Sequence, residues 1–178
     1  MKKLLVIPIL AAFMACSTVK VSYDYDRQAD FSKYKTYAIS EETTKMSLNQ
    51  LDRDRIINAA KTEMTAKGFT EAGNPDVILD LRVKGQEVQT ATATTTGSPY
   101  GYRYRWGYGG GFATTTVNYD SYVEGTIFIT LVDKTTEKIV WQGTGTGTVN
   151  EKATPEKREE NINSAVKQIF TNYPPLVK

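Results

Sequence analysis

Apolar side chains recur at every second position in three separate stretches of this chain. These stretches are residues 19–25, 77–83 and 123–131. In the second one, Val77, Leu79 and Leu81 alternate with Ile78, Asp80 and Arg82. A period of two is typical of strands that place one face in a core and the other toward water. Shorter apolar runs predict two more strands, at residues 35–39 and from residue 139 onward.

Two segments have the features of amphipathic helices. Residues 47–50 form a Ser-x-x-Gln capping box, which predicts a helix that begins there and ends at Lys67. Gly68 then supplies the left-handed residue that often follows a helix. The second helix is predicted to begin at residues 154–155, a threonine N-cap followed by proline, and its apolar stripe ends at the prolines 174–175.

The predicted order is strand, strand, helix, then three strands and a helix. Neighbouring strands without intervening helices favour antiparallel pairing, and two amphipathic helices would cover one face of the sheet. We therefore expect an α+β domain, with a mainly antiparallel sheet of about five strands and two helices on one face. A long Gly/Tyr-rich β-hairpin is predicted to protrude from it.

The N-terminus has the features of an export signal. Lys2 and Lys3 precede an apolar run over residues 4–14, which is followed by Cys16. The run is too short to span a bilayer, which takes about 20 residues. We predict that residues 1–15 are a cleaved signal peptide and that residues 16–178 form a single periplasmic domain.

Cys16 is the only cysteine of the chain, and its position resembles the lipobox of bacterial lipoproteins, in which the thiol is acylated. Ser17 follows it, a pattern similar to that of lipoproteins sorted to the outer membrane. Two or more acyl chains anchor a protein stably, whereas one holds only marginally. The prediction is a lipid-anchored outer-membrane protein that faces the periplasm. A plain secretory signal, or a buried cysteine, is the alternative.

Composition excludes several function classes. Removal of Lys2 and Lys3 with the signal takes the formal net charge from +2 to zero, so nothing favours nucleic acid as a partner. The chain has no histidine, which excludes triads with histidine and ordinary zinc sites. We expect no catalytic residues, no metal and no cofactor.

Several short motifs together resemble the bacterial lipoprotein family called domain of unknown function 4136. They lie at residues 30–37, 67–69, 74–76, 124–126, 140–143, 169–170 and 174–175. Their order and spacing cover nearly all of the mature chain. The resemblance implies a single anchored periplasmic domain and carries over no catalytic residues.

Residues 90–116 are predicted to form the extended hairpin, because threonine-rich runs flank a glycine-rich centre. That centre carries the candidate partner-binding residues: Tyr100, Tyr102, Arg103, Tyr104, Arg105, Trp106, Tyr108 and Phe112. Rigid aromatic side chains are enriched where proteins bind partners. The hypothesis is a contact surface for an envelope protein, a glycan or the membrane. The alternative is an insertion whose aromatic side chains fold back on the domain.

Three function classes follow from these residues. The leading hypothesis is a non-enzymatic binding or envelope-assembly module. A second is a carboxylate-dependent hydrolase of envelope glycans, with the acids 76 and 80, or 120 and 124, as candidates. The third is a structural protein that self-associates through the uncharged runs 90–96 and 114–117.

Overall fold

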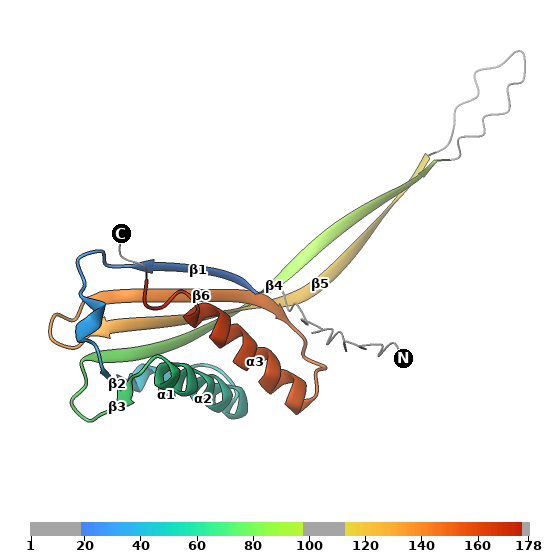
Figure 1. The fold of residues 1–178 in the computed structure, drawn as a ribbon. Coiled ribbons are helices and arrows are strands. Elements are labelled where there is room, and N and C mark those ends of the chain that lie inside the picture. Colours follow the sequence, from blue (N-terminus) through green and yellow to red (C-terminus); the bar gives the residue numbers. More distant parts are fainter. Residues whose placement is uncertain (1–18, 98–112, 176–178) are drawn as a thin grey trace, which may run out of the picture.

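The computed structural model describes residues 19–97 and 113–175. In these residues one sheet has the strand order β1 (Lys20–Tyr25), β6 (Ile139–Val149), β5 (Ala113–Asp133), β4 (Val77–Gly97), β2 (Thr36–Ile39) and β3 (Thr70–Glu71). The helices are η1 (Phe31–Lys33, a 3-10 turn), α1 (Glu41–Thr44), α2 (Gln50–Ala66) and α3 (Pro155–Phe170). Figure 1 shows α2 and α3 side by side against one face of the sheet.

The sheet is mixed, with six described strands rather than about five antiparallel ones. β2 pairs parallel with both β3 and β4, whereas β4, β5, β6 and β1 pair antiparallel. The parallel pairing follows from α2, because a helix between two strands forms the crossover that parallel neighbours need. The two-residue strand β3 and the four-residue helix α1 were not predicted, since elements this short leave no periodic pattern.

The predicted caps are confirmed at two helix ends and wrong at one. The side chain of Thr154 accepts a hydrogen bond from the Lys157 N–H and starts α3, and Gly68 has a φ of 86° after α2. The capping box predicted at Ser47 does not form. Asn49 is the N-cap instead, accepting from the Asp52 N–H, because a carboxylate at that position lets the asparagine amide bond in both directions.

A tightly packed cluster of aromatic residues closes the end of the core that lies farthest from the hairpin. We call it the aromatic end; its members are Tyr34, Tyr37, Phe69, Trp141, Phe170 and Tyr173. Trp141 stacks on Phe170 with ring centroids 5.8 Å apart, and Tyr173 meets the indole edge-on at 5.3 Å. These rings are buried between the sheet and the C-terminal part of α3, so this end of the core is filled.

β4 and β5 run far beyond the rest of the sheet. The last pair that includes β6 joins Val123 to Val149, but β4 and β5 stay in register as far as Gly97 and Ala113. We call residues 88–97 and 113–122 the ribbon. Figure 1 shows it leaving the helices behind as a twisted pair of strands. In the described residues no helix is long and apolar enough to cross a membrane.

Candidate binding cleft

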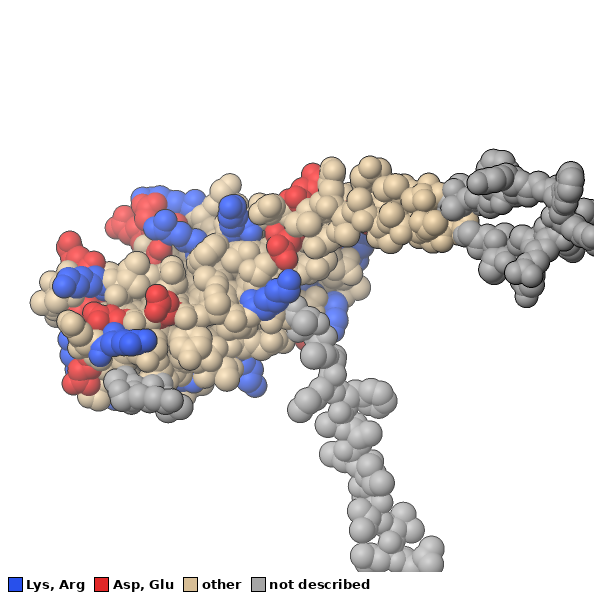
Figure 2. Space-filling model, turned by 90° about the horizontal axis from the view of Figure 1, so that it is seen from above, with Lys and Arg blue, Asp and Glu red and all other residues tan. Residues whose placement is uncertain are grey.

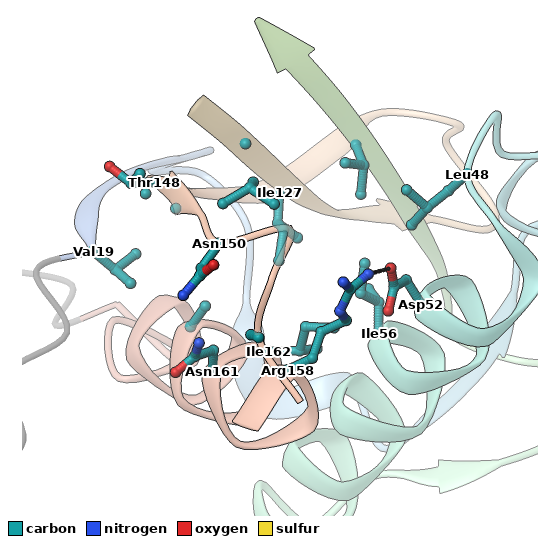
Figure 3. Close-up of a pocket in the computed structure, with 17 residues that line it drawn as sticks. Val19, Leu48, Asp52, Ile56, Ile127, Thr148, Asn150, Arg158, Asn161 and Ile162 are labelled. Atoms are coloured by element: carbon teal, nitrogen blue, oxygen red, sulfur yellow. Dashed lines mark hydrogen bonds and ion pairs between the residues drawn. The ribbon is translucent and has the colours of Figure 1, made fainter. Parts of the chain in front are cut away.

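A cleft of about 440 Å³ opens between the sheet and the N-terminal halves of α2 and α3, where the ribbon leaves the domain. Its floor is the backbone of β5 and β6 at Gly125, Gly145 and Gly147. Figure 3 shows Val19 and Thr148 at one side of the cleft and the Asp52–Arg158 pair at the other. The cleft lies at the end of the core opposite the aromatic end.

The floor of the cleft is bare backbone because alternate residues of β6 are glycines. A Cβ atom on Gly145 would lie 2.7 Å from Ile169 Cδ1, so α3 already touches the sheet there. A Cβ atom on Gly147 would meet only Val19 Cγ2, at 3.7 Å, which is an ordinary contact. The space above Gly147 is therefore not filled by α3 and becomes the cleft.

The walls are aliphatic and come from three elements. Ile127 extends from the sheet, Ile56 from α2, and Ile162 with Ala165 from α3. Ile127 and Ile162 are half-buried. Nearer the aromatic end, the same strand and helix bury Leu131 and Ile169 completely. An apolar pocket of this kind has the size and lining typical of a small-molecule or lipid site, about 300–1,000 Å³.

A network of charged side chains fixes one side of the mouth. The Asp52 carboxylate accepts hydrogen bonds from Asn49 Nδ2 at 2.6 Å, Arg55 Nη1 at 2.7 Å and Arg158 Nη1 at 3.0 Å. Burial acts to raise the pKa of Asp52, but these donors outweigh it and the pKa is lowered. Arg158 also donates to the Glu151 carbonyl at 2.9 Å, so it joins α2 to the segment before α3.

The remaining polar groups of the mouth are uncharged. Asn150 and Asn161 bring amide groups to the cleft, and Thr148 brings a hydroxyl. Together with the paired Asp52 and Arg158, they form a polar rim around an aliphatic interior. The arrangement suits a ligand with an apolar body that enters from the side of Val19.

The carboxylates considered for hydrolysis have other roles. Asp76 accepts the backbone N–H groups of Lys35 and Thr36 at 2.9 and 2.8 Å, and the hydrogen bonds they donate lower its pKa. Asp80 pairs with Arg82 on the sheet face that no described helix covers. Asp120 lies on the ribbon, and Glu124 at its base. The structure brings none of these four acids into the cleft.

A second buried carboxylate, Asp133, locks the turn between β5 and β6. It accepts hydrogen bonds from the Tyr34 hydroxyl at 2.8 Å and from the N–H groups of Thr135 and Thr136, and it pairs with Lys33. The Thr136 N–H and the Tyr34 hydroxyl hold the pKa of Asp133 well below its usual range. The Tyr34 hydroxyl belongs to the core, and the two N–H groups belong to the turn. We therefore assign the hydrogen bonds around Asp133 a structural role.

The residues predicted as functional from sequence lie outside the described residues. This holds for Cys16 and for the hairpin centre, namely Tyr100, Tyr102, Arg103, Tyr104, Arg105, Trp106, Tyr108 and Phe112. Within the described ranges, no group of three or more Asp, Glu, Cys or His side chains is placed to hold a metal ion. Sequence reasoning missed the cleft. Its one partial signal was the pair Gly145 and Gly147, which leave one face of this part of β6 without side chains.

Two solved structures resemble this fold at a distance. A PDZ domain protein from Parabacteroides distasonis is 16% identical with a TM-score of 0.47; the match covers 89% of this chain and 35% of that one. A PelC dodecamer from Paraburkholderia phytofirmans is 15% identical with a TM-score of 0.49, covering 86% and 96%. No curated protein matches the chain.

The family assignment comes from the sequence itself. The motifs that suggested it are spread over the domain, from the segment before β2 to the prolines after α3. The sequence model of the family described as domain of unknown function (DUF4136) matches residues 21–175, which includes both helices that line the cleft and the whole hairpin. The chain therefore belongs to the DUF4136 family.

Proposed function

We propose that this protein is a non-enzymatic binding or envelope-assembly module, anchored in the outer membrane through acylated Cys16 and facing the periplasm. Its contact surface is the centre of the hairpin, where Tyr102 and Trp106 lie among other aromatic and arginine residues. The partner is an envelope protein, and a glycan or the membrane itself is the other outcome that the test below allows.

The ribbon is the observation that carries the proposal. Beyond the pair Val88–Tyr122, no strand or helix of the described residues packs against it, and its side chains with described burial are exposed apart from half-buried Val88. A two-stranded ribbon is marginal in water on its own, and ordering its backbone costs conformational entropy. The far end of the ribbon, at Gly97 and Ala113, lies on the order of 30 Å from the domain, at about 3.3 Å per residue, so the ordered arms can hold a contact surface clear of the domain.

The charge on the ribbon supports contact with a protein rather than with nucleic acid. Figure 2 shows almost no Lys, Arg, Asp or Glu along it beyond the base. Its side chains are mostly threonine and alanine, and Thr95 and Thr115 hydrogen-bond across the strands at 3.1 Å. The arms therefore act as a neutral spacer, and recognition is assigned to the hairpin centre.

The cleft supports binding more than hydrolysis. Its carboxylate, Asp52, has both oxygens engaged by arginine side chains, and the acids 76, 80, 120 and 124 lie elsewhere. Acid and base catalysis of glycoside cleavage needs two carboxyl groups about 5–10 Å apart across the substrate. A binding role asks only for the apolar interior and polar rim described above.

Self-association is a second candidate, favoured by the unpaired outer edges of the ribbon. Each ribbon strand has one edge with no described neighbour, and such edges pair readily with another strand. Sedimentation of the mature chain at increasing concentration tests it. Association that disappears when the ribbon is removed supports this candidate, and a monomer at all concentrations contradicts it.

The direct test is crosslinking in cells from photoreactive residues placed at Tyr102 or Trp106. A discrete crosslinked protein is expected in native membranes, and it should disappear in the Cys16→Ala form. The matched control is the same photoreactive residue at Tyr23, which is 49% exposed on the edge strand β1. A crosslink to glycan or lipid instead of protein would assign the other class of partner. If Tyr23 captures the same molecule as Trp106, or if both hairpin positions capture neither protein, glycan nor lipid, the hairpin is not the contact surface.

A further inference from the structure

The cleft remains unassigned by the proposed function, because partner contact is placed at the hairpin centre. Its interior is aliphatic, its floor is bare backbone at Gly147, and α3 leaves the space above that glycine unfilled. Apolar cavities of this kind bind apolar ligands without requiring new hydrogen bonds. The occupant sought is therefore an apolar chain or ring system.

The rim favours a ligand without a charged group. Arg158 directs its donors to Asp52 and to the Glu151 carbonyl, and Asp52 is held in addition by Arg55. Neither charge of the rim is left for a ligand to balance. An uncharged hydrocarbon chain fits these conditions better than a fatty acid does.

Val19 identifies where such a chain comes from. Its side chain lines the cleft, and β1 begins at the next residue. Cys16 is three residues earlier, so it lies within about 10 Å of Val19 at the maximum extension of a chain. A hydrocarbon attached to the Cys16 sulfur reaches the cleft without any change in β1.

We propose that the cleft binds one acyl chain of the protein's own anchor on Cys16. This inference rests on the lipid anchor of the proposed function. In a bilayer the chain loses little by leaving the cleft, because both surroundings are apolar. In water the cleft removes it from solvent, and the gain grows with every buried CH₂. The cleft then shelters one chain while the protein is outside a membrane, and the remaining chains hold the anchor once it is inserted.

The experiment uses the mature chain that begins at Cys16, made without acylation. Since Cys16 is the only thiol, a thiosulfonate reagent attaches a decylthio group or, as a control, a methylthio group to it as a mixed disulfide and releases sulfinate. We call the two products the S-decyl and S-methyl proteins. The probe is N-phenyl-1-naphthylamine, a neutral dye that becomes fluorescent in apolar sites. The S-methyl protein should bind it saturably, and the S-decyl protein at least tenfold more weakly, because its own chain fills the cleft.

Substitution separates the cleft from other apolar patches. Gly147→Leu fills the cleft from the sheet and should weaken dye binding by the S-methyl protein at least tenfold. Gly73→Leu is the matched control: it also has open space around its Cα, but it lies in the turn before β4, away from the cleft, and should leave binding unchanged. Ala165→Leu fills the cleft from α3 and replaces Gly147→Leu if circular dichroism shows that variant unfolded.

Two results would overturn the inference. Equal dye binding by S-decyl and S-methyl proteins means that the chain on Cys16 does not enter the cleft. Dye binding that survives both filling substitutions in folded protein means that the dye reports another site. Because the chain is attached chemically, these results do not depend on processing in cells. The mass of the exported protein tests the anchor separately, and an unacylated Cys16 would contradict the proposed function itself.

Discussion

The two ends of the core are built on the same strands and have opposite character. At the aromatic end Trp141, Phe170 and Tyr173 fill the space between sheet and helix. At the cleft end, six residues farther along β6, Gly147 presents bare backbone beneath an unfilled space. Packing at one end holds the fold together, which leaves the other end available for contact with something else.

The two ends should differ most in the stability lost when a large side chain is truncated to alanine. Trp141→Ala removes a fully buried indole from the aromatic end and should lower the free energy of unfolding by about 3–5 kcal/mol. Ile162→Ala removes a half-buried side chain from the cleft wall and should cost about 1–2 kcal/mol, since part of the site is already open. Urea unfolding of both variants measures these values. Equal losses would mean that the two ends are packed alike.

Adding a methyl group sharpens the comparison within β6. A Cβ atom on Gly143 would lie 2.5 Å from both Ile169 Cγ2 and Trp141 Cη2, so Gly143→Ala should destabilise by about 1–3 kcal/mol. Gly147→Ala meets only Val19 and should change stability by less than about 0.5 kcal/mol. The same unfolding measurement decides. A Gly147→Ala loss as large as that of Gly143→Ala would show that the cleft is closed in solution.

Acid should act through both buried carboxylates. Each has a lowered pKa: Asp133 through the Thr136 N–H and the Tyr34 hydroxyl, and Asp52 because hydrogen bonds outweigh its burial. An aspartate in the unfolded chain titrates at about 3.9, so their stabilisation is present above that pH and is lost as pH falls. Asp133→Asn should cost about 1–2 kcal/mol at neutral pH.

The pH dependence of this stability loss is the control for Asp133→Asn. The difference in urea midpoint between wild type and Asp133→Asn should begin to narrow as pH falls below about 4, because Asp133 is then protonated in the unfolded chain while it stays charged in the folded protein. Asp52→Asn gives the matching comparison at the cleft end. A gap for Asp133→Asn that stays constant with pH would contradict the assigned role of its charge.

The sequence predicts the larger elements well because their patterns are long. The alternation around Leu79 and the caps at Gly68 and Thr154 locate β4 and the two main helices. The sequence does not predict strand pairings that depend on tertiary contacts. β2 is only four residues long, and its parallel pairing is set by the crossover through α2. The local motif at Ser47 was also misleading, because Asn49 caps the helix instead by accepting a hydrogen bond from the Asp52 N–H.

The candidate sites differ in how well the sequence predicts them. Cys16 and the hairpin centre are readable from composition, because a lone cysteine and a run of tyrosines stand out in one dimension. The cleft is not readable in this way, because it exists only once α2 and α3 pack on the sheet. The alternating glycines of β6 suggest close packing, and the structure shows that Gly143 and Gly145 serve that purpose while Gly147 does not.

Removing the ribbon gives the smallest expected change in stability and tests the central claim that partner contact is separate from the stabilising core. Residues 90–120 are replaced by Asn-Gly, a two-residue turn that joins Gln89 to its cross-strand partner Ser121. The free energy of unfolding of this variant, measured with urea, should match that of the intact protein to within about 0.5 kcal/mol. In cells, the anchored variant should lose the partner that co-purifies with the intact chain. Retention of that partner by the folded, anchored variant would contradict the account.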